Sequence, residues 1–154
     1  MAKPEDAWRL AELRYEFRTA MNPAAESREV FIARAEEWMA RRLEADVAWK
    51  CWVAEAGRVV AGHLWLQLVE KVPNPGPELE NIAYITNVYV QPEARGSGAG
   101  RMLVEAAMEF CRENGVDSAI LWPTERSRTL YARHGFREPD DMLEAVLDSG
   151  RGLH

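Results

Sequence analysis

Apolar side chains recur every three or four positions near the start of the chain, which is the period of an amphipathic helix. Leu10, Leu13 and Phe17 follow this spacing within residues 7–21, with charged residues between them. An Asn-Pro pair then interrupts the pattern, and a second helical pattern covers residues 26–46. The chain therefore should open with two helices.

A period of two replaces the helical period in the next segment. Apolar and polar residues alternate over 47–56, Gly57-Arg58 forms a turn signal, and a second strand pattern covers 59–69. These features predict a β-hairpin. Several prolines then mark residues 71–81 as a loop.

After that loop, strand patterns and helix patterns alternate along the sequence. We expect strands at 82–90, 117–122 and 142–147, a helix at 101–114, and a short helix opening near 124–127. Helices interleaved with strands indicate a mixed α/β fold. The length fits a single domain over residues 1–147, followed by a flexible tail at 148–154.

Charge and composition exclude several classes of partner. The net charge is −6 and the isoelectric point is about 5.2, with no run rich in lysine or arginine, so nucleic acid is not expected. No apolar run approaches the roughly 20 residues of a membrane span, and the N-terminus has no signal-peptide pattern. We expect a cytoplasmic protein with no membrane partner. Cys51 and Cys111 lack metal or redox spacing and are expected to be buried free thiols.

A glycine-rich turn joins the strand at 82–90 to the helix at 101–114, with the sequence Arg95-Gly96-Ser97-Gly98-Ala99-Gly100. Backbone N–H groups and the helix dipole attract phosphate at such a turn. The dinucleotide fingerprint is excluded because it needs glycine where Arg101 stands. The nucleoside-triphosphate loop is excluded because no lysine follows Lys71.

Two segments share their spacing with one enzyme family. Arg95, Gly98 and Gly100 match the pattern Gln/Arg-x-x-Gly-x-Gly/Ala, and residues 130–136, Leu-Tyr-Ala-Arg-His-Gly-Phe, match Leu-Tyr-x-x-x-Gly-Phe. The chain thereby resembles the GNAT superfamily of acetyl-CoA-dependent N-acetyltransferases, strongly over 82–136 and loosely upstream. The resemblance implies a central, mostly antiparallel sheet of about six strands flanked by four helices. Because only three residues precede the first helix, the first strand should be short or absent.

The resemblance also implies a donor site. Acetyl-CoA would be the co-substrate, and no metal is expected. Its pantetheine arm would bond to the backbone of Val88, Tyr89 and Val90, and Ser127 would lie near that arm or position the phenol of Tyr131. Its pyrophosphate would bind the loop residues Arg95, Gly96, Ser97, Gly98, Ala99, Gly100 and Arg101. Arg95 either adds charge there or braces the loop.

For the reaction, the resemblance implies direct acetyl transfer in a ternary complex to a primary amine of a small molecule or peptide. Tyr131 would protonate the departing thiolate. The expected acceptor contacts are Trp65, Tyr84 and Asn87. The general base stays open among Glu70, Glu80, His63, Glu125 and a chain of water molecules.

Two other functions stay open. A non-catalytic module that binds an acyl-CoA or a protein partner would share the fold. A nucleotide- or phosphosugar-binding domain unrelated to the family would share only the phosphate loop. The family's fold often dimerises, so a homodimer is a further expectation. The sequence does not reveal the acceptor or the length of the acyl group.

Overall fold

The computed structural model describes residues 1–45 and 47–147, which fall into two compact units. The first unit is Met1–Leu121, and the second begins at Trp122. The expectation of a single domain over 1–147 stays a prediction. The expected tail at 148–154 lies outside the described residues.

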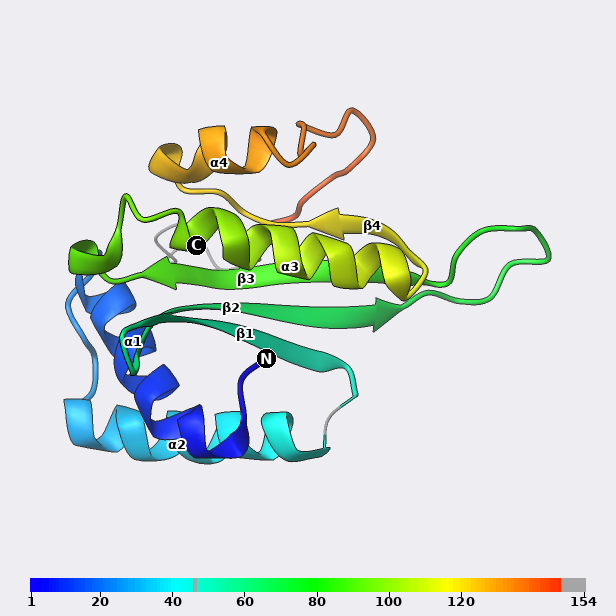
Figure 1. The fold of residues 1–154 in the computed structure, drawn as a ribbon. Helices are drawn as coiled ribbons and strands as arrows, with labels where there is room; N and C mark the ends of the chain where they lie inside the picture. Colours follow the sequence, from blue (N-terminus) through cyan, green and yellow to red (C-terminus); the bar gives the residue numbers. More distant parts are fainter. Residues whose placement is uncertain (46, 148–154) are drawn as a thin grey trace. The chain divides into compact units, whose positions relative to one another are not determined.

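The first unit is a four-stranded mixed sheet with helices packed on it (Figure 1). Its strand order is β1-β2-β3-β4; the first three strands are antiparallel, and β4 runs parallel to β3. The elements are α1 (Ala7–Thr19), α2 (Arg28–Ala45), β1 (Trp49–Ala56), β2 (Val59–Glu70), β3 (Asn81–Val90), α3 (Ala99–Glu113) and β4 (Val116–Ile120).

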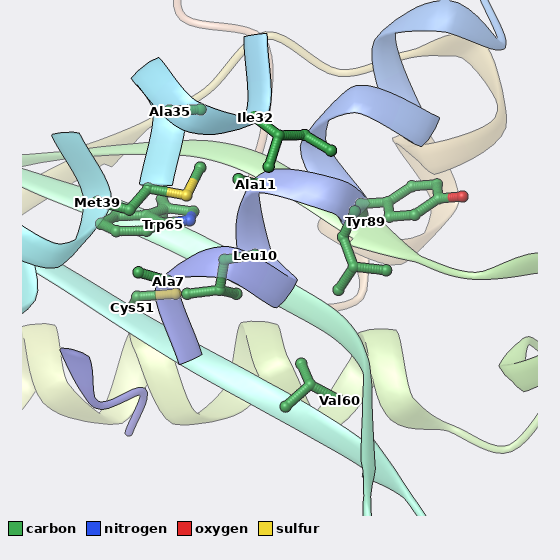
Figure 2. Packing of buried hydrophobic residues seen from close by; sticks show 11 residues of the cluster. Ala7, Leu10, Ala11, Ile32, Ala35, Met39, Cys51, Val60, Trp65 and Tyr89 are labelled. Atoms are coloured by element: carbon green, nitrogen blue, oxygen red, sulfur yellow. The ribbon is translucent and has the colours of Figure 1, made fainter. Parts of the chain in front are cut away.

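Neighbouring residues of β1 show how the two sheet faces are covered. Cys51 is fully buried in the cluster that α1 and α2 build on one face (Figure 2). The next residue, Trp52, packs against Phe110 of α3, with ring centroids 5.5 Å apart. Because successive side chains of a strand point to opposite faces, α3 covers the face away from α1 and α2.

The main core lies between the sheet and the first two helices. Leu10 and Leu13 of α1 are fully buried, which confirms the helical pattern of the sequence. Trp65 of β2 is buried beside Trp38 and Trp49, at centroid distances of 5.6 and 6.1 Å. Apolar burial of this size is the main stabilising contribution to a fold of this length.

Helix α3 presents one apolar stripe to the sheet. Its buried residues recur at helical spacing and are Ala99, Leu103, Val104, Ala107 and Cys111. This stripe explains why α3 contacts all four strands. Cys51 and Cys111 are both buried and free, as their apolar surroundings in the sequence predicted.

In the described residues the sheet has four strands rather than about six, and the first strand, which was expected to be short or absent, is absent. At the N-terminus, a single backbone bond joins the Ala2 N–H to the Cys51 carbonyl at 2.8 Å, and η1 begins at Pro4. The strand expected at 142–147 is wrong. Its apolar pattern is not used for burial, since Leu143 and Leu147 are 99% and 96% exposed.

In its described part, residues 122–147, the second unit contains one short α-helix, α4 (Arg128–Ala132), which follows a 3-10 turn at Glu125–Ser127. Gly135 ends this helical segment with a left-handed φ of +88°. The N–H of Phe136 then donates to the Tyr131 carbonyl at 3.2 Å. A glycine in this conformation, followed by a bond back to the last turn, is a common way to end a helix.

Candidate donor and acceptor site

Strand β3 carries an extra residue in its middle. Its pairing with β2 shifts between Trp65↔Thr86 and His63↔Tyr89, so β3 has one residue more than β2 in this interval. Asn87 lies at this bulge with φ +54°, a left-handed conformation that is uncommon outside glycine. The bulge therefore redirects the backbone at the point where the sequence placed both donor and acceptor contacts.

The same strand has an open edge beyond the bulge. β3 pairs with β4 from Asn81 to Tyr84, and β4 ends at Ile120, whereas β3 continues to Val90. In the described sheet, no strand pairs with residues 85–90 on that side. Backbone groups at such an edge are free to bond to an extended ligand. The assignment of Val88 and Tyr89 to the donor's arm stays a prediction.

The glycine loop leads from this edge into α3. Gly96 and Gly98 have φ of +79° and +86°, which side chains other than glycine rarely adopt. Gly98 caps α3, and no side chain bonds to the first turn of the helix. The N–H groups of Ala99, Gly100 and Arg101 are thus available at the positive end of the helix dipole.

The polar side chains of the loop mainly hold the loop itself. The Nε of Arg95 donates to the Val90 carbonyl at 2.9 Å, and its guanidinium lies 5.9 Å from the centre of the Tyr89 ring. The Ser97 hydroxyl donates to the Ala94 carbonyl at 2.8 Å. Of the two expected roles of Arg95, this geometry displays the bracing one. The binding of an anion by the backbone N–H groups of this loop stays a prediction.

Gly62 allows β2 and β3 to approach closely beside the site. A Cβ at this position would lie 2.9 Å from the Tyr89 carbonyl oxygen. We expect Gly62→Ala to lower the free energy of unfolding by about 1–3 kcal/mol through overpacking, as measured by urea denaturation. Gly76→Ala is the control, because its Cβ would meet nothing within 4 Å. Equal stability of the two variants would contradict this close approach.

Helix α1 contributes an arginine that the sequence interpretation missed. The Nη1 of Arg14 donates to the Asn87 side-chain oxygen at 2.9 Å, which ties α1 to the bulge of β3. Burial, and then the charge of Arg18, lowers the pKa of Arg14 to about 10. The negative charge of an ionised Tyr84 would oppose this lowering of the Arg14 pKa. The structure thus joins Asn87 directly to Arg14, with Tyr84 within electrostatic range.

A second polar group fixes α1 to the end of β3. Arg9 donates to the Gln91 side-chain oxygen at 2.8 Å and pairs with Glu12 at 3.2 Å. Gln91 in turn donates to Glu16 at 2.9 Å. Arg28 of α2 also pairs with Glu12. These carboxylates are therefore already neutralised by the protein's own cations.

Trp65 and His63 of β2 lie deeper than the sequence suggested. Trp65 packs in the aromatic core and is 2% exposed. The predicted contact of Trp65 with the acceptor stays a prediction. His63 is fully buried, and neither ring nitrogen has a hydrogen-bond partner among the described residues. Burial, and then the charge of Arg14, lowers the pKa of His63 to about 3. The imidazole is neutral at pH 7 and is shielded from solvent.

Tyr131 and Ser127 lie together in the second unit. The Tyr131 ring is buried and packs edge-to-face with Phe136 at 5.7 Å. Burial raises the pKa of Tyr131 to about 12, and a bond with the Ser127 side chain opposes this shift. The phenol is thus protonated at neutral pH, as a general acid must be. His134 contacts the Leu130 carbonyl through Nδ1 at 2.9 Å.

The sequence profile of the Acetyltransferase (GNAT) family matches residues 9–136, far more than half of the chain. The chain belongs to this family. This confirms the resemblance stated from the two motifs. Over 150 residues, the GNAT chain is 26% identical to the uncharacterized N-acetyltransferase YhfO of Bacillus subtilis (strain 168), covering 96% of this chain and 94% of that protein.

Other relatives match the GNAT chain over shorter stretches. It is 31% identical over 91 residues to glucosamine 6-phosphate N-acetyltransferase of Trypanosoma brucei brucei, or 59% of each chain. The chain spans less than two thirds of the length of the first curated relatives it matches.

The GNAT fold itself is shared with solved structures. One is a Clostridium acetobutylicum protein described as a predicted acetyltransferase with acetyl-CoA, with a TM-score of 0.76 and 20% identity. The match covers 95% of this chain and 93% of that one.

The described residues contain neither a cluster of three or more metal-ligating side chains nor a helix long and apolar enough to cross a membrane.

Proposed function

We propose that this chain is an N-acetyltransferase that moves the acetyl group of acetyl-CoA to a primary amine of a small molecule or peptide. The observation that carries the proposal is the glycine loop opening α3 directly after the unpaired edge of β3. One feature suits a pyrophosphate and the other suits an amide-bearing arm. The two follow each other along the chain in the order in which acetyl-CoA presents these groups.

The residues present fit the donor. The loop is exposed at residues 95–97, and its glycines give a ligand close access to the backbone. The first-turn N–H groups of α3 suit the negative charge of the pyrophosphate. On β3, the free backbone edge suits the amides of the pantetheine arm, which would align the thioester with the bulge at Asn87.

The reaction needs one bond made, one bond broken and two proton movements. The amine nitrogen bonds to the acetyl carbon while the carbon–sulfur bond breaks, without a covalent enzyme intermediate. The amine loses its proton to a base that is not assigned to a residue. Tyr131 donates its phenolic proton to the thiolate, and solvent restores that proton. Holding both reactants in one complex supplies a large part of the rate.

The names of the relatives support the reaction class. The two relatives from Trypanosoma brucei brucei and Bacillus subtilis are both named as N-acetyltransferases. The first of them is named for an amino sugar phosphate, glucosamine 6-phosphate. A solved neighbour of the same fold is described with acetyl-CoA. Cytoplasmic location and a homodimer stay predictions.

A panel of primary amines tests the proposal. Amino acids, amino sugars, polyamines and peptides are incubated with acetyl-CoA and the full chain, and free thiol is measured together with the acetylated product. We expect one class of amines to release thiol in a one-to-one ratio with product. Acetyl-CoA binding without thiol release from any amine would instead indicate the non-catalytic binding module.

A further inference from the structure

Arg14 has an unusual balance of charge for a half-buried arginine. A guanidinium has five N–H donors. Among the described residues Arg14 donates one hydrogen bond, to the neutral Asn87 side chain, and its guanidinium lies 5.9 Å from the centre of the Phe17 ring. No carboxylate lies within 4 Å of it among residues 1–45 and 47–147. Arg18, a cation of the same helix, lies near it. A buried charge normally has a counter-ion.

The neighbouring acidic residues do not supply this counter-ion. Glu12 pairs with Arg9 and Arg28, and Glu16 pairs with Arg9 and accepts from Gln91. The lowered pKa of Arg14 has the same cause, since burial is not offset by an anion. An arriving anion would thus find one guanidinium with unused donors and no competing carboxylate.

The position of Arg14 connects it to the reaction. It holds Asn87 at the bulge of β3, next to Val88 and Tyr89, whose backbone is proposed to align the thioester. Tyr84, a phenol on the same strand, lies within electrostatic reach of Arg14. An anion bound here would therefore lie beside the bulge with which the thioester is proposed to align.

We propose that Arg14 binds a carboxylate or phosphate group of the acceptor, so that the substrate class is anionic primary amines. This inference rests on the proposed function and narrows it. Arginine suits both groups because its planar guanidinium can donate two parallel N–H bonds to two oxygens of a carboxylate or phosphate. The Asn87 side-chain oxygen accepts a hydrogen bond from one side of the Arg14 guanidinium and thereby orients it.

The test compares amines that differ in one anionic group. The pairs are 2-aminoethyl phosphate with ethanolamine, and phenylalanine with phenethylamine; the first reports on phosphate and the second on carboxylate. We expect the wild type to prefer one anionic member in kcat/KM. A hydrogen bond to a charged group is typically worth about 10- to 100-fold, so Arg14→Gln should reduce that preference by this factor, through KM. Arg14→Lys should restore part of it.

Controls separate binding from bracing. If Arg14 only braced the bulge, Arg14→Gln would slow both members of a pair equally, and the proposal would be overturned. Arg41→Gln removes a cation that pairs with Glu37 on the exposed side of α2 and should leave the preference unchanged. If Arg14→Gln does not fold, the kcat/KM values of the wild type for the two amine pairs decide the question. A higher kcat/KM for the neutral member of both pairs would contradict the proposal.

A binding measurement distinguishes this inference from the enzymatic one. Calorimetry with both members of each pair, in the presence of CoA, requires no turnover. If no amine releases thiol, the proposed function fails. Tighter binding of one anionic member of the two pairs, lost in Arg14→Gln, would then still support the anion site. Equal binding within both pairs would overturn it while leaving acetyl transfer intact.

Discussion

Tyr131→Phe should lower kcat by about 100-fold or more, the usual contribution of a positioned general acid, while the affinity for acetyl-CoA stays unchanged. The substitution keeps the ring that packs against Phe136 and removes the proton donor. Steady-state kinetics gives kcat, and calorimetry gives the affinity. An unchanged kcat would remove Tyr131 from the acid role.

The control for this variant lies on the same short helix. Thr129→Val removes a hydroxyl from an exposed position of α4 and should leave kcat within about threefold, as for most surface substitutions. The pH profile gives a second check. Because burial raises the pKa of Tyr131 from 10.0 to about 12, the free enzyme should show no alkaline loss of activity from this residue below pH 10.

Gly98→Val should weaken acetyl-CoA binding by at least about tenfold, since a left-handed φ costs a β-branched residue of order 1–3 kcal/mol and displaces the loop. Gly98 has φ +86° at the start of α3. Calorimetry measures the dissociation constant directly. An unchanged constant would show that the pyrophosphate does not bind at this loop.

A matched glycine separates strain from binding. Gly57 also has a left-handed φ, +67°, and like Gly98 leaves open space around an added Cβ. It lies in the hairpin turn between β1 and β2. Gly57→Val should therefore lower stability to a similar extent without changing the affinity for acetyl-CoA. Equal losses of affinity in both variants would attribute the effect to general destabilisation.

Local patterns predicted the parts of the fold that depend on neighbouring residues. The helical spacing of Leu10 and Leu13 and the hairpin turn at Gly57-Arg58 are properties of short segments, and the structure confirms both. The motif at Arg95, Gly98 and Gly100, taken together with the motif at residues 130–136, indicated the family, and the profile match confirms it.

The number of strands depends on partners far away in the chain, and here the sequence prediction failed. Residues 142–147 have a strand-like pattern, but a strand forms only where another strand pairs with it. Residues 1–3 were expected to form a short first strand or none, and one backbone bond to Cys51 is what forms.

The acceptor side of the site was the least predictable. The bulge at Asn87 arises from the register between β2 and β3, which no local pattern encodes. Arg14 looked like a solvated charge of an amphipathic helix. The one available signal was its position between Leu10 and Phe17 on the apolar side of α1. An arginine at such a position needs a partner, and that requirement is a usable sequence criterion.

Hydrogen–deuterium exchange with and without acetyl-CoA tests the central claim most directly, because it reports both binding and its place. The account predicts slower exchange of the amides of residues 96–101 and at the open edge of β3, residues 88–90, when the full chain is saturated with acetyl-CoA. Unchanged exchange in both segments at millimolar acetyl-CoA, or protection confined to other segments, would contradict it.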